Sequence, residues 1–225
     1  IYIGQTKIMN RSEQGLGLSK YALASANFFK EENLEGPIFN DTDIGSYLIG
    51  QLYPNEKVFA DNRFGDAYSA SFFINIYLPM IRDEEKWEEG VEKYNFNTIF
   101  FYHYDNVDGA RDFLFRRVYD PKWAWVYVDP HVVIFVRNVE KNAEVISRFQ
   151  ISSDTILDRL NFLSESDNPE DLLAAADILN LIGAVNYSMP YYMKFLSLKP
   201  HVGPVWFVLG KTELMKANQE SSNPN

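Results

Sequence analysis

Between residues 36 and 63, short apolar segments alternate with an amphipathic one. Ile38 and Phe39 form the first apolar segment, and residues 57–60 (KVFA) form the second. Between them, apolar residues recur at the spacing of one helical face, at Ile44, Tyr47, Leu48 and Leu52. A Pro-Asn pair then ends the helical pattern. This part of the sequence therefore predicts a β-α-β unit, in which the two strands run parallel.

Strand and helix patterns continue up to residue 138. They predict helices over 18–34, 83–94 and 108–119, and strands over 97–102, 123–128 and 131–136. Only Asp129 and Pro130 separate the last two strands, which indicates an antiparallel hairpin. We therefore predict an α/β domain over residues 19–138, with three helix-sheet-helix layers and a mixed, mainly parallel sheet. Residues 1–18 are expected to be an irregular lead-in from a preceding segment.

Residues 139–218 carry only helical patterns, and the polar residues 219–225 predict a disordered tail. Trp206, Leu209 and Gly210 match the W-x2-L-G start of a tetratricopeptide repeat, a helical hairpin of about 34 residues. One repeat earlier, these positions hold Leu172, Ala175 and Ala176. We predict a tetratricopeptide-like helical extension. The alternative is an ordinary helical hairpin that packs on the α/β domain.

Composition and charge narrow the possible functions. The chain has 31 acidic and 21 basic residues, and its formal charge of −10 disfavours binding to nucleic acid or anionic lipid. The absence of cysteine excludes disulfides, thiolate metal sites and a cysteine nucleophile. No apolar run approaches the roughly 20 residues that cross a bilayer. Because the chain begins at Ile1 rather than Met, we interpret it as a piece of a longer protein.

Polar residues follow each of the first three predicted strands. The candidate ligand-binding residues are Asn40, Asp41, Asp43, Asp61, Asn62, Arg63, Tyr68, His103 and Asp105. Since the carboxyl ends of parallel strands meet at one edge of a sheet, we expect these side chains to converge there. Carboxylates at such an edge could bind sugar hydroxyls, hold a divalent cation or raise one another's pKa for acid-base chemistry. Tyrosine rings could stack on sugar rings.

Each candidate also has a purely structural interpretation. Asp41 could cap the helix that follows it, and Asp61 and Arg63 could form an ion pair. His103 could be a hydrogen-bonded histidine. The glycine-rich phosphate-binding motifs, the G-x-S-x-G nucleophile motif and paired metal-ligating histidines are absent from the sequence. We therefore assign no catalytic residue, no metal ligand and no cofactor.

Two segments around these residues resemble a known family. Residues 40–49 read N-D-T-D-I-G-S-Y-L-I and residues 58–63 read V-F-A-D-N-R. They are similar to the N-[ND]-x-D-x-G-x-Y-L-I and V-F-x-D-[GN]-R segments in the soluble tails of polytopic bacterial membrane proteins of the glycosyltransferase and oligosaccharyltransferase type. The resemblance covers roughly residues 18–138. It implies a position on the extracytoplasmic face of a bacterial cell membrane, attached through upstream membrane segments.

The resemblance also implies a function for this piece. In that family the metal and the lipid-linked donor are bound largely by membrane loops, which this chain does not contain. We expect the α/β domain to support acceptor or glycan binding and not to catalyse transfer alone. The alternative from another class is a protein-interaction module that acts through the tetratricopeptide-like helices, with a structural α/β domain. A free-standing hydrolase or transferase is disfavoured because the nucleophile and phosphate motifs are missing.

Overall fold

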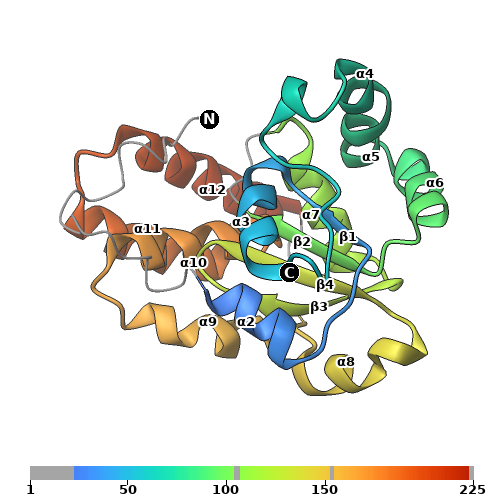
Figure 1. The fold of residues 1–225 in the computed structure, drawn as a ribbon. Coiled ribbons are helices and arrows are strands. Elements are labelled where there is room, and N and C mark those ends of the chain that lie inside the picture. Colours follow the sequence, from blue (N-terminus) through green and yellow to red (C-terminus); the bar gives the residue numbers. More distant parts are fainter. Residues whose placement is uncertain (1–22, 104–106, 153–154, 223–225) are drawn as a thin grey trace. The chain divides into compact units, whose positions relative to one another are not determined.

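The computed structural model describes residues 23–103, 107–152 and 155–222 (Figure 1). These residues fall into two compact units, which we call the α/β unit (up to residue 152) and the helical unit (from residue 155). The predicted lead-in, residues 1–18, lies outside the described residues. No described helix combines the length and the apolar character needed to cross a membrane.

The α/β unit is built on a four-stranded sheet in the order β1-β2-β4-β3. Its strands are β1 (Ile38–Asn40), β2 (Thr98–Tyr102), β3 (Trp123–Val128) and β4 (Val132–Arg137). β1 and β2 run parallel, whereas the β2–β4 and β3–β4 pairs are antiparallel. The predictions of an α/β fold, a mixed sheet and a closing hairpin are confirmed. The prediction of a mainly parallel sheet is wrong, since one of the three pairings is parallel.

The error arises at residues 57–60, which were predicted to form a parallel strand and do not. The side chain of Asn40 takes the place of a neighbouring strand. Its Oδ1 accepts hydrogen bonds from the backbone nitrogens of Phe59 (2.8 Å) and Ala60 (3.4 Å), and its Nδ2 donates to the carbonyl of Ala60 (2.7 Å). One buried amide therefore satisfies backbone groups that would otherwise need a sheet partner.

Helices cover both faces of the sheet, because successive strand residues point to opposite sides. On one face lie α2 (Ala24–Glu31), α3 (Thr42–Leu52) and α8 (Ala143–Phe149), whose apolar residues share a core with Ile38 and Phe100. On the other lie α6 (Glu84–Tyr94) and α7 (Ala110–Tyr119). There the ring of Phe39 contacts Trp87 and Phe113, with centroids 4.9 and 5.5 Å apart. The unit is thus a three-layer sandwich (Figure 1).

Shorter helical segments connect these layers. They are η1 (Phe64–Asp66), α4 (Ala70–Phe72), the π-helical turn η2 (Phe73–Tyr77), α5 (Leu78–Arg82) and η3 (Glu140–Asn142). The segments α4, η2 and α5 follow one another without a break, so residues 70–82 form one helical run. Tyr77 on this run is buried and its hydroxyl donates to the carbonyl of Asn40 (3.3 Å). The run is therefore fixed to the end of β1.

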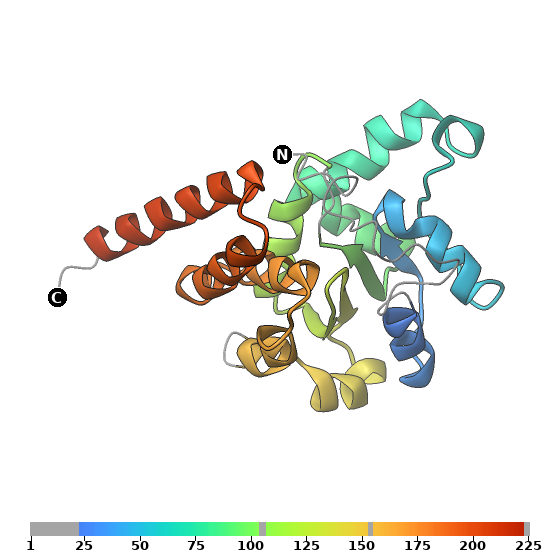
Figure 2. The ribbon, with the colours of Figure 1, turned by 90° about the vertical axis from the view of Figure 1, so that its left-hand side faces the viewer.

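The helical unit contains α9 (Ile156–Ser164), α10 (Pro169–Leu181), α11 (Val185–Leu198) and α12 (Gly203–Ser222). Helix α11 packs against both α10 and α12, which are drawn in orange to red in Figure 2. Their shared core consists of Leu172, Leu173, Ala176, Tyr192, Phe195, Leu196, Val205 and Leu209. Because α12 continues to Ser222, the first residues of the predicted disordered tail are helical.

Candidate ligand-binding site

The parallel β1–β2 pair brings the carboxyl ends of both strands to one edge, which we call the carboxyl edge. Asp41 ties the two strand ends together. Its Oδ1 caps α3 by accepting from the backbone nitrogen of Ile44 (2.9 Å), and its Oδ2 accepts from the backbone nitrogen of Tyr102. The side chain is fully buried. Asp41 therefore builds the edge and is not at the surface.

A glycine brings the segment 60–61 directly against the first turns of α3. A Cβ atom on Gly45 would lie 2.2 Å from the carbonyl oxygen of Ala60 and 2.6 Å from the Cα of Asp61. These are backbone atoms, and they cannot yield without moving the segment. Gly45 thus allows α3 and the backbone of residues 60–61 to approach more closely than any residue with a Cβ atom would permit. The contact places Asp61 beside the first turns of α3, the helix that carries Asp43 near its start.

Asp61 is enclosed by donors from its own segment. Its Oδ1 accepts from the backbone nitrogen (3.0 Å) and Nε (2.8 Å) of Arg63, and its Oδ2 accepts from Nη2 of Arg63 (2.6 Å) and the hydroxyl of Tyr68 (2.8 Å). The hydrogen bonds from Arg63 lower the pKa of the buried Asp61 to about 2, against the opposing effect of burial. Asp61 therefore acts as an anchor that orients Arg63 and Tyr68.

The surface of the edge is formed by the residues that Asp61 and α3 hold in place. The Arg63 side chain is 60% exposed, and Asp43 and Asn62 are exposed. Asn62 is fixed through its Oδ1, which accepts from the hydroxyl of Ser46 (2.6 Å). Tyr68 is half-buried. A carboxylate, an amide and a guanidinium are thus offered to solvent beside a phenol ring.

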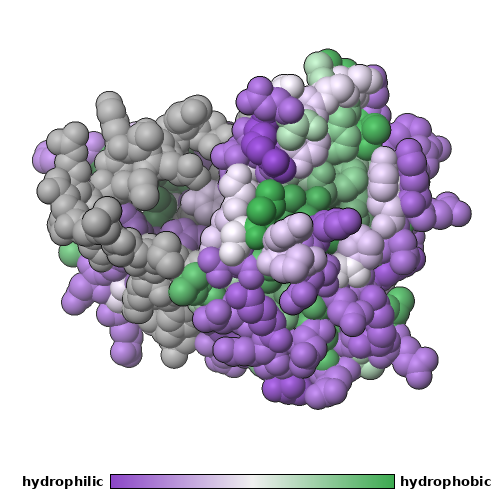
Figure 3. Space-filling model, viewed as in Figure 1, coloured by the Kyte–Doolittle hydropathy of each residue, from purple (hydrophilic) through white to green (hydrophobic). Residues whose placement is uncertain are grey.

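Aromatic side chains extend this surface along residues 68–74. The ring of Tyr68 stacks on Phe72 with centroids 5.2 Å apart, and Phe73 meets it edge-on at 5.7 Å. Both phenylalanines are half-buried, and Ile74 is 64% exposed. In Figure 3, hydrophobic residues lie on the surface over α4 and α5, next to hydrophilic ones. Sequence reasoning missed Phe72 and Phe73, although the run Y-S-A-S-F-F places three aromatic residues within six positions.

His103 follows β2 but lies inside the unit, with 2% of its surface exposed. Its Nε2 is 2.9 Å from the carbonyl oxygen of Pro130. Burial, followed by the proximity of His131, lowers the pKa of His103 to about 3. The imidazole is therefore neutral at physiological pH and is part of the buried interior, where it is not available to a ligand. Asp105, the last candidate, lies outside the described residues.

The depressed pKa of His103 predicts a pH dependence of stability. An unfolded histidine binds a proton below about pH 6.5, while the buried one does so only near pH 3. We therefore expect the free energy of unfolding to fall as the pH decreases from 6.5 towards 3, and the His103→Gln variant to lack this part of the decrease. Urea unfolding of both proteins at a series of pH values measures the difference. A difference that stays constant from pH 7 to pH 4 would contradict the assignment.

The turn of the β3–β4 hairpin lies at the same edge. The backbone nitrogen of His103 donates to the carbonyl of His131 (3.1 Å). Asp129, in this turn, is buried and accepts from the Tyr127 hydroxyl (2.7 Å) and from the backbone nitrogens of His131 (2.7 Å) and Val132 (2.8 Å). Burial raises the pKa of Asp129. The sequence predicted the turn at Asp129-Pro130 but not its place at the candidate edge.

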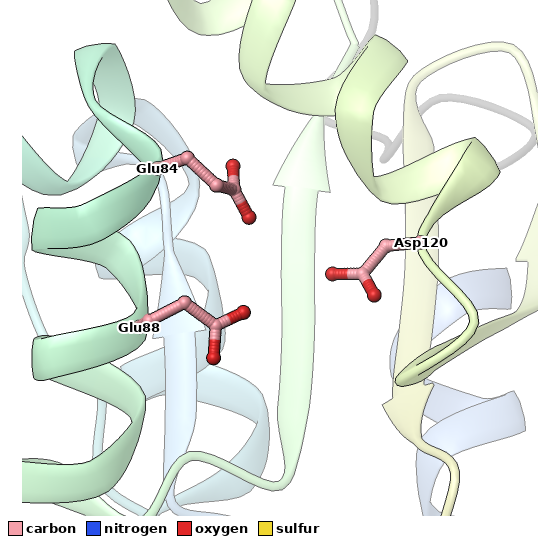
Figure 4. A group of neighbouring side chains, drawn as sticks. All are labelled: Glu84, Glu88 and Asp120. Carbon is pink, nitrogen blue, oxygen red and sulfur yellow. The ribbon is translucent and has the colours of Figure 1, made fainter.

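Among the described residues, the three carboxylates close enough to share a metal ion lie elsewhere. Glu84 and Glu88 on α6 approach Asp120, which follows α7, with ligand oxygens within 4.8 Å of one another (Figure 4). Basic side chains already neutralise each of them: Arg116 and Arg117 bind Glu84, Lys122 binds Glu88 (2.7 Å), and Arg117 lies 3.4 Å from Asp120. Three negative charges meet three positive charges, so the group is best explained as an ion-pair network joining α6 to α7.

A concavity of about 580 Å³ lies at the other end of β2, by the residues that precede it. It is lined by Glu85, Glu88, Glu89, Val91, Glu92, Asn95 and Arg137. Lys86 binds Glu89 and Lys122 binds Glu88, each at 2.7 Å, so much of its acidic charge is paired. None of the predicted site residues lines it.

Comparison of the chain with protein-family models, with curated proteins and with solved structures finds no match.

Proposed function

We propose that the α/β unit binds a glycan, or the sugar-like part of an acceptor, at the carboxyl edge. The observation that carries this proposal is the geometry around Asp61, which fixes Arg63 and Tyr68 at the edge that also carries the exposed Asn62 and, near the start of α3, the exposed Asp43. In line with the family resemblance of residues 40–63, we place this unit in a membrane glycosyltransferase-like protein, on the extracytoplasmic face of a bacterial membrane.

The chemistry of the edge suits neutral polyhydroxylated ligands. Sugar hydroxyls both donate and accept hydrogen bonds. A site that binds them therefore needs carboxylate or amide oxygens as acceptors together with N–H donors. Arg63 uses Nε and Nη2 on Asp61 and presents the rest of its guanidinium to solvent. Tyr68, backed by Phe72, offers an aromatic surface for the apolar face of a sugar ring. The Asp61–Arg63 pair is neutral as a whole, which favours hydroxyls over a phosphate group.

The same geometry supports binding without catalysis by this chain alone. Asp41 and Asp61 are fully buried, and their oxygens are engaged by backbone and side-chain donors. Acid-base catalysis needs a carboxyl group within reach of the reacting bond. Among the predicted site residues that the structure describes, the exposed carboxylate is that of Asp43, and a second one is needed for glycosidic chemistry of the usual kind. We infer that any catalytic centre lies largely outside this chain.

Calorimetric titration with an N-acetylglucosamine trisaccharide and a neutral hexose trisaccharide tests this proposal. We expect at least one probe to bind, and Asp43→Ala, Asn62→Ala and Tyr68→Ala each to weaken binding by about tenfold, or about 1.4 kcal/mol. Tyr68→Phe, which keeps the ring but removes the hydroxyl bound to Asp61, is expected to lose less than Tyr68→Ala.

The exposed Arg159 on α9 provides the control. Arg159→Ala should bind the trisaccharide like the unmodified protein, and all variants should keep their thermal unfolding midpoints within a few degrees. Unchanged affinity in both Asp43→Ala and Tyr68→Ala would remove the assignment of the edge.

We further infer that α10, α11 and the start of α12 form a tetratricopeptide-like unit and the first helix of a next one. The residues at the predicted motif positions support this, since Leu172 and the small Ala175 and Ala176 are all completely buried in α10. Short side chains permit two antiparallel helices to pack closely. This unit gives the chain a second candidate function as an interaction module, for which the exposed apolar residues of α12 are the specific evidence.

A further inference from the structure

The segment from Asp61 to Tyr68 forms a closed loop at the carboxyl edge. Its two ends meet on one carboxyl group, because Oδ2 of Asp61 accepts from the hydroxyl of Tyr68 (2.8 Å) as well as from Nη2 of Arg63 (2.6 Å). Within the loop, the backbone nitrogen of Asp66 donates to the carbonyl of Arg63 (3.0 Å). Asp66 is exposed, at the end of η1. The loop therefore presents a carboxylate to solvent between Arg63 and Tyr68.

A second exposed carboxylate, that of Asp43, lies close to this loop. Asp43 and Ser46 are three residues apart in α3, so they are neighbours on the surface of the helix, with Cβ atoms about 5–6 Å apart. The hydroxyl of Ser46 donates to Oδ1 of Asn62 (2.6 Å), which fixes the loop beside that surface. Asp43, Ser46 and Asn62 are all exposed. The start of α3 and the loop thus form one continuous polar surface.

This surface has an excess of negative charge. Residues 40–46 and 60–68 together contain four acidic residues and a single basic one, Arg63. Because Arg63 is bound to Asp61, that pair is neutral as a whole. Among the residues that the structure describes, no lysine or arginine forms an ion pair with Asp43 or Asp66. The two exposed carboxylates are therefore available to a positively charged ligand.

The positive charge is expected to be part of an organic ligand. Within the described part of the chain, the three carboxylates that could share a metal ion lie elsewhere, at Glu84, Glu88 and Asp120. At the carboxyl edge, the ring of Tyr68 is backed by Phe72 and offers a surface for the apolar face of a sugar. A sugar that carries ammonium groups matches both the aromatic ring and the negative charge.

We propose that the carboxyl edge prefers a glycan with free amino groups, such as a glucosamine oligosaccharide, over its N-acetylated form. The inference rests on glycan binding by the edge and specifies the class of sugar. A protonated amino group carries a positive charge and three N–H donors, whereas an acetamide is neutral and has one. Asp43 and Asp66 are each expected to favour the amine by about threefold, and together by about tenfold.

Calorimetric titration of the full chain with the glucosamine trisaccharide and the N-acetylglucosamine trisaccharide measures this preference. The two probes share one sugar backbone, and at about pH 6 the amino groups of the first are protonated. We expect the glucosamine probe to bind about tenfold more tightly at about 20 mM salt, and the ratio of the two affinities to shrink at about 500 mM, where exposed charges are screened.

Replacement of either carboxylate by the amide of the same size isolates the effect of charge. Asp43→Asn and Asp66→Asn should each lower the ratio of the two affinities by about threefold. Glu92→Gln is the matched control, because Glu92 is also exposed but lines the concavity at the other end of β2. It changes the net charge of the chain by the same amount and should leave the ratio unchanged.

A lysine tripeptide separates a preference for amino sugars from attraction to any cation. It carries positive charges but has no sugar ring for Tyr68, so we expect it to bind about tenfold more weakly than the glucosamine probe. Tripeptide binding as tight as that of the glucosamine probe, or a ratio that Glu92→Gln lowers as much as Asp66→Asn does, would overturn the inference.

The titrations also distinguish this inference from the glycan-binding proposal. Equal affinity for the two trisaccharides overturns the preference for amino groups and leaves glycan binding by the edge in place. A chain that binds neither of them, nor the neutral hexose trisaccharide, contradicts both.

Discussion

Replacing Asn40 by alanine should lower the free energy of unfolding by about 3 kcal/mol. The amide is completely buried and bonds to the backbone of both Phe59 and Ala60. Its removal leaves a buried backbone N–H and a buried carbonyl without their partner, and each such group costs about 1–3 kcal/mol. Urea unfolding followed by tryptophan fluorescence measures the loss, and hydrogen exchange should show faster exchange at the Phe59 amide.

Two variants calibrate this prediction. Asn40→Asp keeps an oxygen that can accept from the Phe59 and Ala60 nitrogens but has no N–H to donate to the Ala60 carbonyl, so its stability should also be reduced. Asn62→Ala, at an exposed asparagine of the same edge, should cost less than about 1 kcal/mol. If Asn40→Ala were as stable as Asn62→Ala, the bridging role of Asn40 would be wrong.

The second large effect is expected at Gly45. Any Cβ there meets the backbone of Ala60 and Asp61 at 2.2 and 2.6 Å, so Gly45→Ala forces α3 and this segment apart. Overpacking of this kind typically costs about 1–3 kcal/mol. Because the displaced segment carries Asp61 and Arg63, we also expect the variant to lose trisaccharide binding. Thermal unfolding and calorimetric titration of one preparation report both effects.

Gly50, in the same helix, provides an internal control. It is exposed and a Cβ atom there would meet nothing within 4 Å. Gly50→Ala should therefore stabilise the protein by up to about 1 kcal/mol through better helix propensity, and should leave binding unchanged. Equal behaviour of the two alanine variants would contradict the close contact between α3 and the carboxyl edge.

The sequence predicted the architecture of the α/β unit well where the pattern was long and regular. The hydrophobic run of β2 and the β3–β4 hairpin around Asp129-Pro130 carry strong strand and turn signals, and both were found. Residues 57–60 have the composition of a strand, and nothing local distinguishes them from one. What decides their conformation is the side chain of Asn40, 20 residues away for Ala60, which is a tertiary effect.

The candidate site was predictable as a location but not in its division of roles. The ends of the predicted strands identified Asp41 and Asp61 as well as Asp43, although the strand before Asp61 does not form. Burial then separates them: backbone and side-chain donors enclose the first two, and Asp43 remains exposed. Hydrogen bonds from distant backbone groups, such as that of Tyr102 to Asp41, leave no trace in the local sequence. Hence only the three-dimensional structure distinguishes the buried residues that build the edge from the residues that are exposed on it.

The central claim is that the carboxyl edge binds a glycan. A titration of the isotope-labelled full chain with the N-acetylglucosamine trisaccharide, followed by amide NMR shifts, tests it most directly. We predict saturable shifts concentrated at Asp43, Asn62, Arg63 and Tyr68. Shifts that concentrate on the helical unit, or a spectrum that the trisaccharide and the hexose probe both leave unchanged at millimolar concentration, would contradict the claim.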